Sequence, residues 1–370
     1  MTEPLVWLPY DPAELGEVPR GLRYVWSVPG EPPPAGLDEV ELFVPSYAFA
    51  DLDPGVFDRM PRLRVVQSLT AGVEHLAPHL PEGVLLCNGG GIHDASTAEM
   101  ALTLILAALR GIPDFVRAQD RGEWAWQWRP ALADKRVLIV GYGRIGAAIE
   151  ARLVPFECTV VRVARSAREG VHSTEELPRL LPGADVVVVI VPLSPSTRHL
   201  VDQDFLAAMK DGALLVNVAR GAIVDTDALV RSLHEGRIHA ALDVTDPEPL
   251  PAGHPLWSAP RLLISPHTGG SSTAMWPRAH RLVREQLARF AAGEPLVNQM
   301  ERACTGVRFR LARGCCGVHS RIREGCPAGR RRCPGARCSR GSAGRPARRR
   351  SFRWAGPSRP RPRPRRRSSP

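Results

Sequence analysis

The stretch that decides the fold is residues 136–146, RVLIVGYGRIG, an apolar run followed at once by a glycine-rich turn. The run has the length of a buried strand, and the turn has the spacing GxGxxG before a helical pattern. In that context the first glycine allows a tight turn, the second lets backbone approach a pyrophosphate, and the third allows close helix packing. We therefore predict a dinucleotide site made by Gly141, Tyr142, Gly143, Arg144, Ile145 and Gly146.

From residue 136 onward, short apolar runs alternate with amphipathic segments. Because these runs are continuously apolar, they are typical of a parallel sheet that is covered on both faces. The pattern predicts an α/β protein with a doubly wound (Rossmann) sheet of six parallel strands and crossover helices. The strands are expected at residues 137–140, 159–163, 186–191, 214–217, 240–244 and 262–265, with helices at 145–153, 174–181, 203–208 and 226–235.

The residues before this sheet form a second group of elements. Strands are expected at 41–44, 63–68 and 84–87, and a long apolar helix at 96–110. We expect Ser96 to cap this helix and Glu99 to complete a capping box, and the helix to be buried between domains. Trp124, Trp126 and Trp128 alternate with other residues, as in a half-buried extended segment. This favours packing against the domain boundary over a role in substrate selection, near the expected cleft or dimer contact. A last amphipathic helix is expected at 272–292.

The basic charge of the chain lies in its last 70 residues. The whole chain has 49 Lys+Arg and 38 Asp+Glu, but residues 301–370 hold 22 Arg and two acids, a net charge of +20. Residues 1–300 have a net charge of −9, so the body gives no sign of specific nucleic-acid recognition. The tail is predicted to be disordered because it has few apolar side chains to bury. It is either a nonspecific nucleic-acid-binding arm or the product of a shifted reading frame.

Other features bear on the compartment and on metals. No apolar run approaches the ~20 residues of a membrane span, and the N-terminus has no signal-peptide pattern. Only Cys87 and Cys158 of the eight cysteines lie in the body, which favours a reducing, cytoplasmic setting without membrane contact. His75 and His79 have the spacing of a metal pair, but Pro78 interrupts the helix and no third ligand is spaced with them, so no metal is expected.

The residues after the second strand bear on the choice of cofactor. A dinucleotide site usually carries an acid there, about 20 residues past the glycines, to bind the adenosine ribose. Here the positions hold Arg165, Ser166 and Arg168, and the first acid is Glu169. Arginine and serine suit a 2′-phosphate, which favours NADP(H) over NAD(H). The alternative is that the arginines are solvated and either cofactor is accepted.

Three residue types with complementary chemistry follow three successive strands. Arg220, Glu248 and His267 each come after the carboxyl end of a strand, the edge at which ligands bind in open α/β sheets. A guanidinium can clamp a carboxylate, a histidine can exchange a proton with a carbonyl oxygen, and a glutamate can stabilise the protonated histidine. Their joint placement beside a nucleotide fold predicts oxidoreductase chemistry on a small acid.

Residues 67–299 resemble the D-isomer-specific 2-hydroxyacid dehydrogenase family, which includes glyoxylate and hydroxypyruvate reductases. The motifs GYGRIG, VPLSPSTRHLV, MKDGALLVNVARGAIVD, ALDVTDPEPLP and SPHTGG match the signatures of that family in order and spacing. The resemblance implies a smaller flavodoxin-like substrate domain (residues 1–105 and 275–300), a coenzyme domain (106–274) and a homodimer. Glu157 stands where the family often has glycine.

The resemblance also implies roles for individual residues. Arg220 would bind the substrate, His267 would be the acid–base residue, and Glu248 would be its partner. Asp243 would orient the nicotinamide carboxamide and Thr97 would lie near the nicotinamide. The backbone N–H groups of Ala71, Gly72 and Val73 would bind the substrate carboxylate.

The expected function is the NADP(H)-preferring reduction of a small 2-oxo acid, with glyoxylate and hydroxypyruvate as the leading candidates. One alternative is a phosphoglycerate- or phosphite-type dehydrogenase, although the 69–75 loop supplies no extra cation for such a substrate. Another alternative is a non-catalytic, dinucleotide-sensing protein similar to a corepressor.

Overall fold

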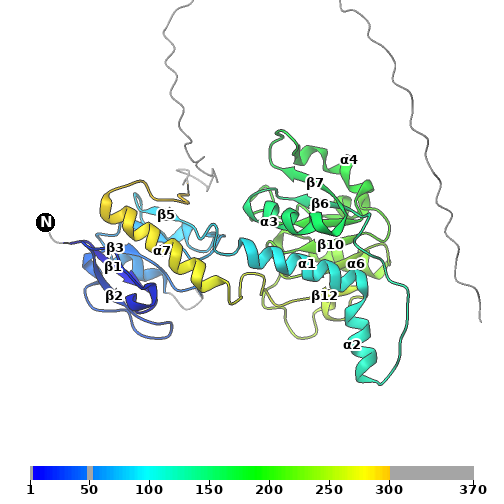
Figure 1. Ribbon diagram of the computed structural model, residues 1–370, viewed down its shortest axis with the longest axis horizontal. Coiled ribbons are helices and arrows are strands. Elements are labelled where there is room, and N and C mark those ends of the chain that lie inside the picture. The colour runs from blue at the N-terminus through cyan, green and yellow to red at the C-terminus, as the bar shows by residue number, and fades with distance from the viewer. Residues whose placement is uncertain (1–2, 48–52, 301–370) are drawn as a thin grey trace, which may run out of the picture. The chain divides into compact units, whose positions relative to one another are not determined.

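The computed structural model describes residues 3–47 and 53–300, all within one compact unit, Met1–Gly314. The arginine-rich tail, residues 301–370, lies outside the described residues. The prediction that it is disordered therefore also concerns residues that the structure does not describe. The described residues form two parallel sheets with helices around them (Figure 1).

The larger sheet has seven parallel strands in the order β12-β11-β10-β9-β6-β7-β8. This order reverses between β6 and β9, which confirms the doubly wound fold and places its ligand-binding crevice at the carboxyl ends of those strands. The sequence predicted six strands and missed β8, which is too short for an apolar run to reveal it. The strands are β6 (Arg136–Val140), β7 (Thr159–Ala164), β8 (His172–Ser173), β9 (Val186–Val189), β10 (Leu214–Asn217), β11 (His239–Leu242) and β12 (Leu262–Ile264).

Two hydrophobic cores cover the two faces of this sheet. Alternate residues of β6 point to opposite faces, so Val137 and Ile139 join one core while Leu138 and Val140 join the other. The first core includes residues of α1 and α3, and the second includes residues of α4, α5 and α6. These helices are α1 (Asp94–Arg110), α3 (Arg144–Leu153), α4 (Leu177–Leu180), α5 (Gln203–Ala208) and α6 (Thr226–His234).

Helix α1 differs from its prediction at its first turn. It begins at Asp94, and Ser96 is buried within it rather than capping it. The Ser96 Oγ lies 2.6 Å from the Ser272 Oγ, so the expected capping box is wrong because a tertiary hydrogen bond takes the hydroxyl. The helix packs on α3 and the larger sheet, ends at Gly111 in the left-handed region, and is followed directly by α2 (Ile112–Asp120).

The smaller sheet is also parallel, in the order β2-β1-β3-β4-β5, which is the flavodoxin-like order. The sequence did not reveal β1 or β2, because prolines and glycines break the apolar pattern there. Helix α7 (Met275–Ala292) packs its apolar face on this sheet. The division of the chain at residues 105 and 275 stays a prediction. The strands are β1 (Leu5–Leu8), β2 (Arg23–Trp26), β3 (Val40–Phe43), β4 (Val65–Gln67) and β5 (Leu85–Cys87).

Among the described helices, none is by itself long and apolar enough to cross a bilayer. Only α1 and α2 taken together reach that length and composition, and they meet at a 64° bend.

Candidate functional site

A cavity of about 300 Å³ brings together most of the residues singled out from the sequence. Glu248 reaches the cavity through its contact with His267, while the side chains of Tyr142, Val73, Arg165, Ser166 and Arg168 lie outside its wall. The predicted residues in the wall are Ala71, Gly72, Thr97, Gly141, Gly143, Arg144, Ile145, Gly146, Arg220, Asp243 and His267.

The glycine-rich turn between β6 and α3 has the geometry that its spacing predicts. Gly141 has a φ of +114°, and a Cβ there would lie 2.3 Å from the carbonyl oxygen of Ile190. A Cβ on Gly146 would lie 2.6 Å from the Gly141 oxygen, so the turn and the helix pack too closely for a side chain. A Cβ on Gly143 would meet nothing within 4 Å. This leaves open space beside the helix N-terminus, and the residues therefore fit a dinucleotide pyrophosphate.

The segment after β7 lies beside this turn. Arg168 donates from Nη2 to the Tyr142 carbonyl oxygen at 2.6 Å, and its guanidinium lies 5.8 Å from the centre of the Tyr142 ring. The guanidinium of Arg162 also lies over that ring, at 5.6 Å. Arg165 and Ser166 are exposed and have no hydrogen-bond partner within residues 3–47 and 53–300. Arg168 and Arg162 therefore border the turn, and the exposed Arg165 and Ser166 are available to a ligand.

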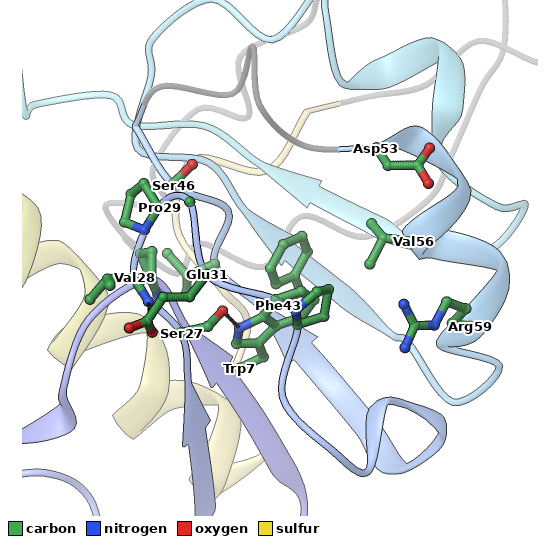
Figure 2. A pocket seen from close by; sticks show the side chains of 14 residues that line it. Trp7, Ser27, Val28, Pro29, Glu31, Phe43, Ser46, Asp53, Val56 and Arg59 are labelled. Carbon is green, nitrogen blue, oxygen red and sulfur yellow. Dashed lines mark hydrogen bonds between the residues drawn. The ribbon is translucent and has the colours of Figure 1, made fainter.

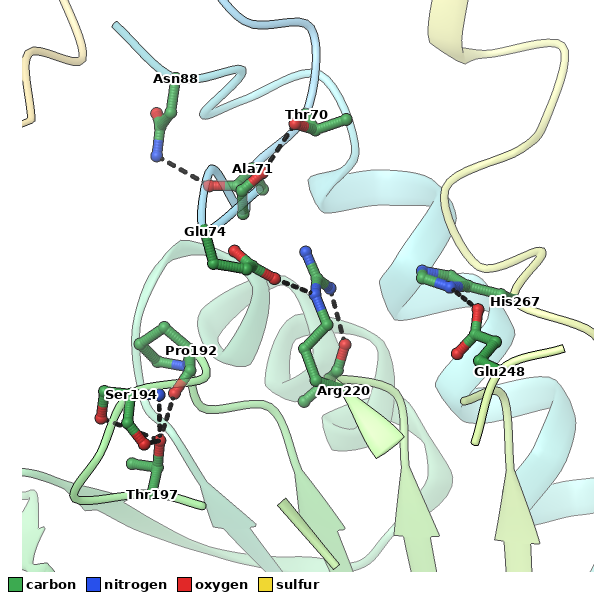
Figure 3. A network of polar contacts seen from close by, with 12 residues as sticks. Thr70, Ala71, Glu74, Asn88, Pro192, Ser194, Thr197, Arg220, Glu248 and His267 are labelled. Atoms are coloured by element: carbon green, nitrogen blue, oxygen red, sulfur yellow. Dashed lines mark hydrogen bonds and ion pairs between the residues drawn. The ribbon is translucent and has the colours of Figure 1, made fainter. Parts of the chain in front are cut away.

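His267 and Glu248 form a pair at the ends of β12 and β11 (Figure 3). The Nδ1 of His267 donates to the Oε1 of Glu248. Burial alone would raise the pKa of Glu248, but the hydrogen bond and charge of His267 outweigh it and hold that pKa below its usual value. The carboxylate is therefore ionised at neutral pH and holds Nδ1 of His267, while Nε2 of the ring has no hydrogen-bond partner among the described residues.

The loop after β4, residues 69–75, is fixed by side chains that donate hydrogen bonds to its backbone carbonyl oxygens. The Thr70 hydroxyl donates to the Gly72 oxygen at 2.7 Å, and the Asn88 amide donates to the Ala71 oxygen at 3.0 Å (Figure 3). Among the described residues, none accepts a hydrogen bond from the N–H groups of residues 71–73. A Cβ on Gly72 would lie 2.0 Å from Nη2 of Arg220, so the guanidinium lies directly against the backbone of the loop and a side chain at residue 72 would displace it. Backbone donors and a cation therefore converge here, as a carboxylate requires.

The unpredicted residues of the cavity wall include two acids and a histidine, Glu74, Asp94 and His93. Glu74 accepts a hydrogen bond from Nε of Arg220, and Asp94 accepts one from Nε of Arg144 at 3.0 Å. His93 is buried, with its ring nitrogens 2.9 and 3.3 Å from the carbonyl oxygens of Leu69 and Gly270. No periodicity or motif marks these positions. Their only signal in the sequence is that each lies next to a glycine-containing loop.

A second cavity, of about 250 Å³, lies at the carboxyl ends of β1, β2 and β3 (Figure 2). Trp7 and Phe43 form part of its wall, and their stacked rings lie 4.4 Å apart. None of the residues predicted for the site lines it.

A dinucleotide turn, a hydrogen-bonded Glu–His pair and an arginine at one cavity define an NAD(P)-dependent oxidoreductase. Comparison with known proteins specifies the family. Residues 102–269 match the family model for the D-isomer specific 2-hydroxyacid dehydrogenase, NAD binding domain. The chain belongs to the D-isomer specific 2-hydroxyacid dehydrogenases.

Individual relatives agree with this assignment. A glyoxylate reductase of Thermofilum pendens is 34% identical over 260 residues, which cover 66% of this chain and 76% of the relative. A glyoxylate reductase/hydroxypyruvate reductase of Homo sapiens is 33% identical over 256 residues, covering 65% and 77%. The crystal structure of a D-isomer specific 2-hydroxyacid dehydrogenase from Xanthobacter autotrophicus Py2, in complex with NADPH and MES, has a TM-score of 0.70 and 32% identity, covering 81% of this chain and 98% of that one.

Proposed function

We propose that the protein reduces small 2-oxo acids, with glyoxylate and hydroxypyruvate as its leading substrates and NADPH as its reductant. One observation carries the proposal. Arg220 and the unpaired N–H groups of Ala71 and Gly72 lie at the same cavity as His267 and the glycine-rich turn. The glyoxylate reductases among its relatives support this choice of substrate.

In this proposal the nicotinamide, when bound, supplies the hydride that reduces C2 of the substrate. Arg220 and the 71–73 loop hold the substrate carboxylate, and so set the distance and angle of approach. His267 gives a proton to the oxygen at C2, and Glu248 stabilises its protonated form before that transfer. Asp243 and Thr97, both in the cavity wall, are proposed to contact the nicotinamide end of the cofactor.

The preference for NADPH is proposed from the segment after β7. Arg165, Ser166 and Arg168 stand where an acid would bind a ribose hydroxyl, and the structure places Arg168 against the glycine-rich turn. A 2′-phosphate would accept charge-assisted hydrogen bonds from these side chains. The Xanthobacter relative was crystallised with NADPH, which supports the same choice.

The experiment that tests the proposal mixes the protein with NADPH or NADH and a panel of 2-oxo acids, and follows absorbance at 340 nm. We expect turnover of glyoxylate and hydroxypyruvate, faster with NADPH. Oxidation of phosphoglycerate or phosphite in the reverse assay would favour the alternative dehydrogenases. An absence of turnover with every acid and both cofactors would leave a non-catalytic dinucleotide-binding protein.

We also propose that the protein is a homodimer, and that it works in the cytoplasm, where Cys87 and Cys158 stay reduced.

The expectation that Trp124, Trp126 and Trp128 pack against the domain boundary is wrong, because their exposed fractions are 96%, 69% and 87%. Contiguous exposed apolar side chains mark interaction surfaces. Ile112 and Val116 of the preceding helix α2 are also exposed, and a second copy of the chain would cover this surface.

A further inference from the structure

The cation proposed to bind the substrate already has an anionic partner from another part of the chain. Arg220 follows β10 of the larger sheet, whereas Glu74 lies in the loop after β4 of the smaller sheet (Figure 3). The Nε of Arg220 donates to Oε1 of Glu74, and each side chain is about one-third exposed, at 32% and 31%. A Cβ on Gly72 would also lie 2.6 Å from Oε2 of Glu74, so the carboxylate packs against the loop that offers its N–H groups.

This pairing determines which edge of the guanidinium faces a ligand. Glu74 takes Nε, and Nη1 donates to the Ala219 carbonyl oxygen at 2.7 Å. Nη2 lies against Gly72, beside the free N–H groups. Burial raises the pKa of Glu74, but the charge of Arg220 together with hydrogen bonds from the Glu74 backbone and from Arg220 outweighs it and holds the pKa below its usual value. The carboxylate is therefore present as an anion under the conditions of turnover.

In the described part of the wall the other arginine, Arg144, belongs to the glycine-rich turn predicted to bind the cofactor and not to the loop that offers its N–H groups to the substrate. Arg144 is paired with Asp94, and the oxygens of Asp243 accept hydrogen bonds from the His267 loop. Both arginines in the part of the wall that the structure describes thus already face a carboxylate. Only His267, when protonated, adds positive charge near the reacting oxygen.

We infer that Glu74 is a specificity-determining residue, which restricts the site to 2-oxo acids with a single negative charge. This inference rests on the proposed function and names the substrate class of that site. One carboxylate binds the free edge of Arg220 and the loop N–H groups, while Glu74 repels any second carboxylate or phosphate close by. Two like charges about 6 Å apart in a half-buried site repel enough to weaken binding about tenfold to a hundredfold.

The test uses two nearly isosteric acids, oxamate with one negative charge and oxalate with two. Calorimetry measures the Kd of each with NADPH bound to the full chain, in the wild type and in Glu74→Gln. Glutamine keeps an oxygen for Nε of Arg220 but removes the charge. Any effect of His267 on oxalate is common to both proteins, so it cancels when the Kd ratios are compared. Glu74→Asp is the conservative variant, and Glu82→Gln removes an exposed charge elsewhere in the same region as a control.

We expect the wild type to bind oxamate more tightly than oxalate, and Glu74→Gln to lower the ratio of the oxalate Kd to the oxamate Kd about tenfold or more. Glu74→Asp and Glu82→Gln should stay within threefold of the wild-type ratio. Glu74→Ala should raise the KM for glyoxylate more than Glu74→Gln does, because alanine has no acceptor for Nε of Arg220 and no longer fixes the position of the guanidinium.

Three results would overturn the inference. These are an unchanged ratio in a folded Glu74→Gln protein, an equal shift in Glu82→Gln, and a wild type that binds oxalate as tightly as oxamate or binds neither. The proposed function fails by a different readout, namely the absence of NADPH oxidation with every 2-oxo acid. The two failures are therefore distinguishable.

Discussion

The buried carboxylate of Asp243 holds Gly269, because its Oδ2 accepts the Gly269 N–H at 2.8 Å, and a Cβ on Gly269 would lie 2.7 Å from that oxygen. Its Oδ1 accepts from the Thr268 N–H at 3.0 Å and from the Ser265 hydroxyl at 2.6 Å. One side chain at the end of β11 therefore fixes the backbone directly after His267 and the Ser265 side chain before it, and with them the position of the proposed proton donor.

Replacing Asp243 should weaken both stability and turnover. Asp243→Ala leaves one buried and two part-buried donors without this acceptor, which should lower the free energy of unfolding by about 2–4 kcal/mol. A looser His267 loop should lower kcat about a hundredfold, because small misplacements of a reacting group are costly. Urea unfolding and steady-state kinetics measure the two effects. Asp38→Ala, at an exposed position, is the control and should change neither. A wild-type kcat in Asp243→Ala would contradict this role.

His267 should carry the proton for reduction. His267→Ala should lower kcat for glyoxylate about 10²–10⁴-fold while NADPH binding, followed by fluorescence, stays unchanged. Because the protonated imidazole is the active form, kcat/KM for reduction should fall as pH rises and that proton is lost. At low pH, the Glu248 carboxylate should stay ionised at pH values where an ordinary glutamate is already protonated, because its pKa is lowered. A variant with near-normal turnover would rule out this mechanism.

The segment after β7 should set the preference for NADPH. Replacing Arg165 and Arg168 together with alanine removes two charge-assisted donors, each worth about 1.5–3 kcal/mol. The kcat/KM for NADPH should fall at least tenfold, while that for NADH changes less than threefold. Arg179→Ala, in helix α4 of the same region, is the matched control. Equal efficiency with NADPH and NADH in the wild type would defeat the prediction before any variant is made.

Glu157 should be a site for stabilisation. Its φ of +58° lies in the left-handed region, which costs a residue with a Cβ about 1 kcal/mol or more. Glu157→Gly removes that cost, and the gain is partly offset by the greater freedom of glycine in the unfolded chain. The net gain should be about 0.5 kcal/mol with activity unchanged. Glu235→Gly, at a φ of −64°, should instead destabilise, and thermal unfolding compares the two.

The exposed tryptophans should belong to a dimer contact. Replacing Trp124, Trp126 and Trp128 with serine removes three large exposed apolar side chains that no described element covers. Analytical ultracentrifugation should then show a shift from dimer to monomer, with unchanged far-UV circular dichroism. Replacing Trp257, which is 57% exposed elsewhere, is the control. A wild type that sediments as a monomer would contradict the proposed dimer.

Some helices and strands could be predicted from the sequence because a local apolar pattern encodes them. Helix α6 and strand β10 were placed to within a residue or two, since each has a clear apolar pattern bounded by turn residues. Strands β1, β2 and β8 were missed, because short strands next to prolines or glycines have no periodicity to detect. The start of α1 was misplaced because Ser96 bonds to Ser272 instead of to its own helix.

The sequence by itself determined the doubly wound fold, the glycine-rich turn and the candidate Arg220–Glu248–His267 set, because strand–turn–helix patterns and signature spacings are local in the chain. Only the tertiary structure decided that Glu74 faces Arg220 and that Asp94 faces Arg144. The paired residues are 146 positions apart in the first case and 50 in the second. Such pairs depend on how the two sheets and their loops come together, and no spacing along the chain encodes that packing. The charge that a substrate meets in this cavity is therefore a property of the fold.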